Sequence, residues 1–261
     1  MQMDLFDCHC HSERSDCAED VTLEWYARLA RDSSQGFAIT DHSAHIYYPA
    51  DAKWAFWTSQ SRDVFEQNRE YGYAEVARYI ADVRAAQTGG MMLGIELDMF
   101  IDGTPVCDEK RLGDFDIVLG AAHTWPALQN GAEQAIVEAE FKVMAQGLAA
   151  LEVDILVHPF RPMLLKEYLV PDDLIKWLVE FAGEHNIALE INSHNICRDE
   201  DIHMAKLSCE QGVSLAVGTD THRKSEFGDF SYHCEIADGV GILPEQLYWR
   251  PRASVQPQAA K

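Results

Sequence analysis

The sequence is poor in basic residues, in paired cysteines and in long apolar runs. Lys and Arg total 21 against 43 Asp and Glu, which gives a net charge of −22. This charge repels polyanions, so a long nucleic acid is not expected as a partner. The seven cysteines contain no Cys-x-x-Cys pair, which argues against a disulfide framework and indicates a reducing compartment. No apolar run approaches about 18 residues and no signal peptide precedes the first strand, so we expect a cytoplasmic protein without a membrane partner.

The sequence also lacks internal repeats and low-complexity linkers that would divide it into domains. Its 261 residues are 47% hydrophobic, which is ample for one large core. Barrels of the α/β type with about 250 residues commonly form one domain. We predict a single domain over residues 1–249, followed by a flexible C-terminal tail over residues 250–261 that is rich in proline, serine and alanine.

Apolar runs typical of buried strands alternate with helical patterns along the chain. The apolar lead-in to Asp7 is followed by six more runs, over residues 36–40, 91–95, 116–122, 154–157, 187–192 and 214–219. Helical spacing recurs over residues 22–33, 59–87, 132–151, 172–184 and 199–211. Such alternation favours parallel strands joined by helical crossovers. We predict an α/β barrel of seven strands whose C-terminal ends open on one rim.

Side chains that bind metals recur where these strands end. His9 and His11 are two residues apart, so on a strand they point to the same face and can hold one ion. The other strand ends carry further ligand types, namely His42, Glu96, His123, His158, Asp220 and His222. One histidine or acid at a strand end is ordinary. Six such ends in one chain indicate a shared site, and mixed imidazole and carboxylate ligands suit zinc, manganese or iron.

An ordered set of motifs over residues 4–225 resembles the polymerase and histidinol phosphatase (PHP) family. The motifs are His9-x-His11, Asp16, Thr40-Asp41-His42, Gly94-Ile95-Glu96, His123, His158-Pro159 and Asp220-x-His222. The resemblance implies a distorted seven-stranded (β/α)7 barrel that holds two to three divalent transition metals, zinc, manganese or iron. It also implies hydrolysis of phosphate esters.

The resemblance further implies which residues hold each metal. The first site would consist of His9, His11, Glu96 and Asp220, with Glu96 bridging to a second site of His123 and His158. The third would consist of Asp16, His42 and His222. Some members of the family have a histidine one residue after the position of Asp16, where this chain has Cys17. Either Asp16 or a Cys17 thiolate completes the third site, or the third metal binds weakly; we predict Asp16.

The predicted catalytic residues are Glu96, Asp220 and His222. A bridging Glu96 would keep two cations about 3.5–4 Å apart, the spacing at which a shared hydroxide forms and attacks phosphorus. Asp7 and Asp41, next to ligands, are interpreted as acceptors that orient imidazoles. His45 either protonates a leaving group or is an ordinary loop histidine.

Substrate binding is predicted at four arginines that follow strand ends, Arg161, Arg14, Arg198 and Arg223. A guanidinium group matches phosphate geometry, and Arg161 ranks first because it lies three residues after His158. The alternative for each arginine is pairing with a surface carboxylate. The aromatic residues of the segment 47–57 form either a wall or lid for a ring-bearing substrate or ordinary loop packing; they are Tyr47, Tyr48, Trp54, Phe56 and Trp57.

Together these features predict a metal-dependent phosphoesterase that hydrolyses a small phosphorylated metabolite, with histidinol phosphate as one candidate. The alternatives are a phosphodiesterase acting on a nucleotide or sugar phosphodiester, a metal-dependent amidohydrolase, and a metal-binding PHP module without turnover. All nine ligand positions carry a ligand-capable residue, which disfavours the last alternative. The arginines favour phosphate over amide substrates.

Overall fold

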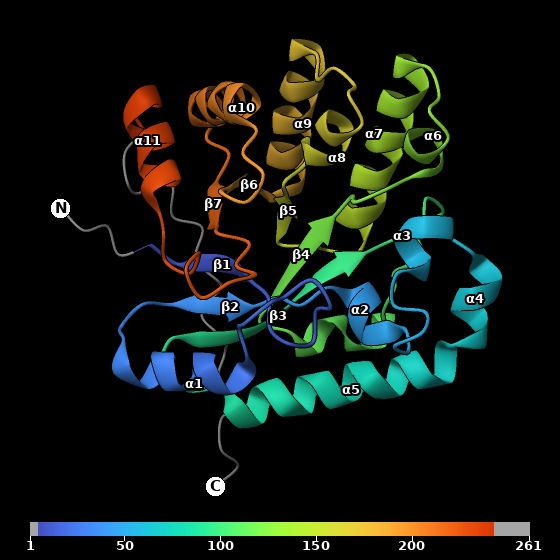
Figure 1. The fold of residues 1–261 in the computed structure, drawn as a ribbon. Helices are drawn as coiled ribbons and strands as arrows, with labels where there is room; N and C mark the ends of the chain where they lie inside the picture. Colours follow the sequence, from blue (N-terminus) through green and yellow to red (C-terminus); the bar gives the residue numbers. More distant parts are fainter. Residues whose placement is uncertain (1–4, 243–261) are drawn as a thin grey trace, which may run out of the picture.

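A computed structural model of the chain, described over residues 5–242, shows a parallel β-barrel surrounded by helices (Figure 1). Seven strands pair in sequence order, and all six pairs are parallel. The strands are β1 (Asp7–Cys10), β2 (Phe37–Ile39), β3 (Met91–Asp98), β4 (Ile117–Ala121), β5 (Ile155–Val157), β6 (Ala188–Asn192) and β7 (Leu215–Gly218). The predicted (β/α)7 barrel is confirmed.

The first and last strands come together just past their C-terminal ends. Cys10 forms a parallel bridge with Thr221, and the backbone N–H of His11 donates to the carbonyl of Thr221 at 3.0 Å. The barrel is therefore nearly closed on the side where the strands end. This closure brings the ligand types that follow β1 next to those that follow β7.

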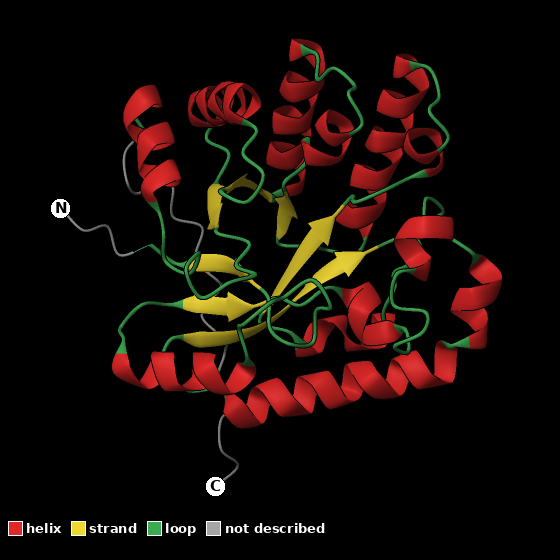
Figure 2. Ribbon diagram, in the orientation of Figure 1, coloured by secondary structure: helices red, strands yellow, loops and turns green. Residues whose placement is uncertain are grey.

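Helices cover the outside of the barrel, and Figure 2 shows them around the central strands. The helices are α1 (Leu23–Asp32), α2 (Ser43–Tyr47), α3 (Ala55–Ser59), α4 (Arg62–Gln67), α5 (Arg69–Ala86), η1 (Glu109–Asp114), α6 (Pro126–Gln129), α7 (Gln134–Ala150), α8 (Arg161–Leu165), α9 (Asp172–His185), α10 (Arg198–Gln211) and α11 (Ser231–Val240). The five predicted helical stretches appear as α1, the pair α4 and α5, α7, α9 and α10. Pro171 is the N-cap of α9.

The barrel interior and the shell outside it form separate apolar clusters. Inside, small and β-branched residues fill the space, including Ala38, Ile117 and Ala216. A larger cluster packs the helices onto the strands. A third cluster joins α2, α3 and α4, and it contains Tyr47, Tyr48, Phe56, Phe65 and Phe100, among others. Three of the five aromatic residues predicted as a substrate wall or as loop packing therefore pack in a core.

Several predictions concern parts of the chain that the structure does not describe. The tail predicted over residues 250–261 and the domain boundary at residue 249 both lie outside residues 5–242, so they stay predictions. Among the described helices, none combines the length and apolarity needed to cross a bilayer. All seven cysteines are free thiols.

Asp201 makes the stability of the fold depend on pH. Burial raises the pKa of this carboxyl to about 7; the Tyr232 hydroxyl, which donates to it at 2.6 Å, opposes the shift, and Glu190 adds to it. A folded-state pKa above the unfolded value of about 3.9 means that stability is full below pH 4 and is lost as the pH rises through 7. We expect Asp201→Asn to raise the unfolding temperature by a few degrees at pH 8 and by less at pH 5. Calorimetry at both values tests this, with exposed Asp199→Asn as control; equal shifts at both pH values would contradict it.

Candidate metal centre

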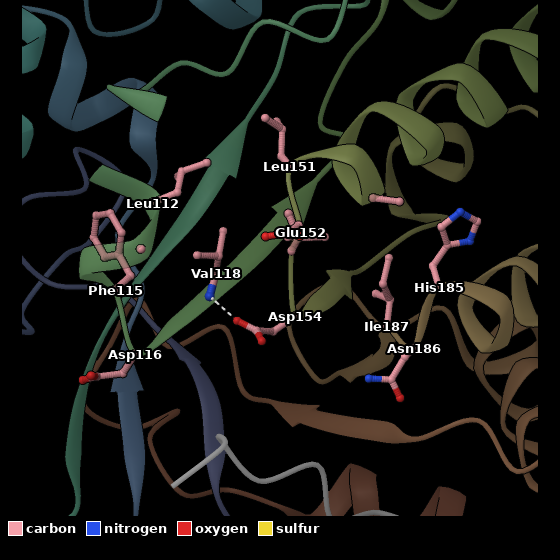
Figure 3. A pocket seen from close by; sticks show the side chains of 13 residues that line it. Leu112, Phe115, Asp116, Val118, Leu151, Glu152, Asp154, His185, Asn186 and Ile187 are labelled. Atoms are coloured by element: carbon pink, nitrogen blue, oxygen red, sulfur yellow. Dashed lines mark hydrogen bonds between the residues drawn. The ribbon is translucent and has the colours of Figure 1, made fainter. Parts of the chain in front are cut away.

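Two pockets of the described structure lie at opposite ends of the strands, and they differ in chemistry. The pocket in Figure 3, of about 530 Å³, lies where β4, β5 and β6 begin. There the Val118 N–H donates to Asp154, and the labelled side chains come from several helices, strands and loops without converging on a point. The second pocket, of about 390 Å³, lies where the strands end and is lined by His42, His123, Asp220 and His222 among others. The predicted ligands therefore gather at the C-terminal end, where barrels carry their sites.

Glu96 lies at the centre of the histidine cluster. Its Oε1 is 2.8 Å from Nε2 of His158 and 3.1 Å from Nε2 of His123. Its Oε2 is 2.6 Å from Nδ1 of His42 and 3.4 Å from Nε2 of His9. The carboxylate is fully buried, and its two oxygens face two different sets of imidazoles. This is the arrangement expected of a carboxylate that bridges two cations.

Asp220 contacts the two histidines at the C-terminal end of β1. Its Oδ1 lies 2.8 Å from Nε2 of His11 and 3.5 Å from Nε2 of His9. Both Asp220 and His158 have positive φ, at 52° and 32°; His158 directly follows β5, and Asp220 lies two residues after β7. Such backbone conformations are costly for residues other than glycine, and they concentrate at functional sites.

Residues beyond the predicted set hold the imidazoles in place. Glu190 Oε1 is 2.8 Å from Nδ1 of His9, and Asp98 Oδ1 is 2.8 Å from Nδ1 of His123. Both carboxylates are fully buried. The approach of Glu190 depends on Gly218, because a Cβ at position 218 would lie 1.8 Å from its Oε1. Glu190 was interpreted only as part of a buried strand, because a single acid within an apolar run carries no pattern that marks it.

The roles predicted for Asp7 and Asp41 are wrong as stated, since neither carboxylate contacts an imidazole in the described structure. Asp7 accepts from the backbone N–H and the hydroxyl of Thr219, at 3.0 and 2.6 Å. Asp41 accepts from Ser15 Oγ at 2.7 Å, and Ser15 in turn lies 3.2 Å from Nδ1 of His11. Both acids position the backbone or a hydroxyl next to a ligand, one step further from the imidazoles than predicted.

Asp16 does not join the cluster, and Cys17 lies there instead. The Asp16 carboxylate accepts from Trp54 Nε1 at 2.9 Å and lies 3.7 Å from Lys53 Nζ, with 47% of the side chain exposed. Cys17 Sγ is 3.1 Å from Nε2 of His222. Burial alone would raise the pKa of this thiol, but hydrogen bonds with His222 and His42 lower it to about 7. The structure therefore places Cys17, and not Asp16, beside His222, while the choice of ligand for the third site stays a prediction.

One of the four predicted arginines faces the pocket. Arg161 is buried, and its Nη1 donates to Asp220 Oδ2 at 2.6 Å and to the His194 carbonyl at 3.3 Å. The other three have exposed side chains that pair with surface carboxylates. The pairs are Arg14 with Asp82, Arg198 with Glu235, and Arg223 with Glu19. These three arginines therefore form surface ion pairs, which was the alternative to phosphate binding.

His45 and two tryptophans, Trp54 and Trp57, also line this pocket. The ring of His45 packs edge-on against Trp54 and Trp57, with centroids 4.8 and 4.6 Å away. The Asp16 N–H donates to Nδ1 of His45 at 3.1 Å, so the ring proton lies on Nε2, which is buried and has no hydrogen-bond partner. Burial, His42 and Lys53 together lower the pKa of His45 to about 2. His45 is therefore a neutral hydrogen-bond donor at physiological pH.

The cluster fits divalent metal ions. His9 Nε2, His42 Nδ1 and Glu96 Oε2 are all buried without a hydrogen-bond partner although they lie close together. Buried polar atoms of this kind need a partner, and a shared cation provides one. Burial and Arg161 lower the pKa of His158 to about 4, which keeps its imidazole neutral and available for binding a metal. Although burial opposes it, the neighbouring imidazoles hold the pKa of Glu96 well below its usual value.

Comparisons with known proteins agree with this geometry. The PHP domain profile matches residues 7–194. The probable phosphatase YcdX of Escherichia coli K12 is 24% identical over 248 residues, covering 92% of this chain and 88% of that protein. A probable phosphatase of Proteus mirabilis is 27% identical with the same coverage. The DNA polymerase/3′-5′ exonuclease PolX of Bacillus subtilis is 28% identical over 83% of this chain, which spans only 34% of PolX.

A solved structure shares the fold. The crystal structure of histidinol phosphate phosphatase from Lactococcus lactis, complexed with zinc, L-histidinol and phosphate, has a TM-score of 0.55. The identity is 11%, and the alignment covers 92% of this chain and 95% of that one. The fold and site thus define a parallel seven-stranded barrel with a metal-binding cluster at the ends of its strands. The chain belongs to the PHP domain family, as its motifs predicted.

Glu190 is expected to set the affinity of the site for metal through His9. Its Oε1 faces His9 Nδ1, while its Oε2 accepts from the His158 N–H at 2.8 Å. Glu190→Gln replaces one acceptor by an NH2 group and removes the charge. Residues that orient ligands contribute about 10–100-fold to metal affinity, so we expect a loss of that size. Competition with a chelator measures it, and exposed Glu180→Gln on α9 is the control; unchanged affinity in Glu190→Gln would show that His9 needs no such partner.

Proposed function

We propose that this chain is a phosphatase that removes the phosphate group from a small phosphorylated metabolite. Its class follows from the family and the cluster: it is a metal-dependent hydrolase that acts on phosphate ester bonds. The observation that carries the proposal is the bridging position of Glu96 between two sets of imidazoles, beside a pocket that also contains Arg161.

The residues around the pocket have distinct roles in this proposal. His9, His11 and Asp220 would hold one metal and His123 and His158 a second, with Glu96 shared. When bound, two or three ions of zinc, manganese or iron supply activation of water and neutralisation of phosphoryl charge. Arg161, held by Asp220, presents a guanidinium group to the phosphate. His45 lines the same pocket, and its Nε2–H, which has no partner in the protein, would donate a hydrogen bond to the substrate.

The size and walls of the pocket favour a small monoester. At about 390 Å³ it has the volume of a metabolite site. Trp54 and Trp57 line the same pocket as Arg161, and their rings suit a substrate with a ring. Histidinol phosphate has this chemistry, and the structural relative from Lactococcus lactis was crystallised with L-histidinol and phosphate. A nucleotide or sugar phosphodiester is the alternative substrate in the same class.

Metal removal tests the proposal directly. We expect two to three transition-metal ions per chain by elemental analysis, and we expect a chelator to abolish hydrolysis of phosphomonoesters until zinc, manganese or iron is restored. Phosphodiesters and amides are assayed in parallel. Fewer than one ion per chain after loading with each metal would refute the cluster. Cleavage of amides without cleavage of phosphate esters would show an amidohydrolase instead.

A further inference from the structure

The thiol of Cys17 faces the histidines of the predicted third metal site. Its Sγ lies 3.1 Å from Nε2 of His222. Ligand atoms of Cys17, His42 and His45 all lie within 4.8 Å of one another, and those of His11, His42 and His222 form a second group with the same limit. His42 and His222 both lie close to the thiol, whereas Nε2 of His11 lies 2.8 Å from Oδ1 of Asp220.

The path of the chain after β1 turns Cys17 inward and Asp16 outward. The Asp16 N–H donates to Nδ1 of His45, which fixes the backbone against α2. The Asp16 carboxylate then reaches the indole of Trp54 at 2.9 Å, at the exposed side of the loop. To enter the cluster it would have to leave both Trp54 and Lys53. Cys17 needs no such movement, because its thiol already touches His222.

His45 is a poor metal ligand although it lies in the same group. Its Nδ1 accepts the Asp16 N–H, so its Nε2 carries the proton and has no lone pair for a cation. The ring is also held by edge contacts with Trp54 and Trp57. Of the nitrogen donors near the thiol, this leaves His42 and His222.

We propose that Cys17, His42 and His222 bind a thiophilic divalent metal, zinc or ferrous iron, through one thiolate and two imidazoles. A sulfur and a nitrogen on one tetrahedral zinc ion lie roughly 3.5 Å apart, given Zn–S and Zn–N bonds of about 2.3 and 2.0 Å. The 3.1 Å between Cys17 Sγ and His222 Nε2 needs little adjustment to reach this separation. The inference rests on the proposed function only for the presence of metal ions at the neighbouring sites, because binding of a metal by Cys17 requires no turnover.

The thiolate determines which metal the site prefers. Soft sulfur ligands select zinc and iron, whereas carboxylate and carbonyl oxygens suit manganese and magnesium. The sites around Glu96 offer only nitrogen and oxygen atoms. We therefore expect the third ion to be zinc or iron even in protein whose other ions are manganese.

Cobalt substitution tests the proposal by spectroscopy. Loading wild-type protein with Co²⁺ should produce the thiolate-to-cobalt charge-transfer absorption in the near ultraviolet. Cys17→Ser should lose this band together with about one ion per chain, while the fold, followed by circular dichroism, is retained. Cys234→Ser on α11 is the control and should keep both. Absence of the band from wild type, or its survival in Cys17→Ser, would overturn the proposal.

Two further measurements separate the candidates without relying on that variant. Asp16→Asn should keep the band and the full metal content; loss of an ion there would assign the site to Asp16. In unmodified protein, zinc should protect Cys17 from iodoacetamide, as read by mass spectrometry of the labelled peptides, and equal labelling with and without zinc would contradict the inference. A cobalt band in protein without phosphatase activity would support this site and refute the proposed function.

Discussion

Glu96→Gln is expected to lower phosphatase kcat/KM by roughly a thousandfold or more, the largest effect of any single substitution in the chain. Both carboxylate oxygens of Glu96 face imidazoles, two at Oε1 and three at Oε2. The amide has nearly the same shape but no charge, and its NH2 group cannot bind a cation. The binding of both metals that share Glu96 should weaken together. The loss of activity should therefore be that of the whole two-metal site and not of a single contact.

Metal content distinguishes this explanation from a simple loss of folding. Elemental analysis of Glu96→Gln should show fewer ions per chain than wild type, while circular dichroism is unchanged. The matched control is Glu140→Gln on α7, where the carboxylate accepts the Ala127 N–H at 2.7 Å, a bond that the amide oxygen can retain. A Glu96→Gln protein with full metal content and activity within tenfold of wild type would refute the bridging role.

Arg161→Ala should lower kcat/KM on a phosphomonoester by roughly ten- to a hundredfold, with Arg161→Lys in between. A charge-assisted hydrogen bond contributes about 1.5–3 kcal/mol, and lysine keeps the charge without the paired donors. Arg161 is 8% exposed and its guanidinium donates to Asp220, so it is already oriented before substrate binds. Inhibition by inorganic phosphate should weaken by the same factor.

The contact between Arg161 and Asp220 makes metal content part of this experiment. If Arg161 binds phosphate, the alanine variant loaded with excess metal should hold as many ions as wild type. If its role is only to hold Asp220, metal content and activity should fall together. Arg198→Ala is the control, because that guanidinium pairs with Glu235 at the surface, 2.5 Å away. Full activity in Arg161→Ala would assign phosphate binding to the metals or to other side chains.

The seven strands and most of the candidate site were predictable because they depend on local pattern. A parallel strand buried on both faces is a continuous apolar run, and the residue that follows it lies on the shared rim whatever the rest of the fold does. This is why eight of the nine predicted ligands, from His9 to His222, lie in one cluster. The short helices α2, α3, α6 and α8 were not predicted, because helices of four or five residues contain too few turns to produce a periodic pattern.

The sequence by itself determined the seven-stranded barrel and the types of residue at the C-terminal ends of its strands. Only the tertiary structure shows that Cys17 rather than Asp16 lies beside His222, because the path of the loop depends on a hydrogen bond from the Asp16 N–H to His45, 29 residues away along the chain. Only the tertiary structure identified Glu190 as the partner of His9, across 181 residues. Both contacts join loops or strands that closure of the barrel brings together. A pattern along the sequence indicates on which face of a strand a residue lies, but it does not identify the distant residue that it contacts there.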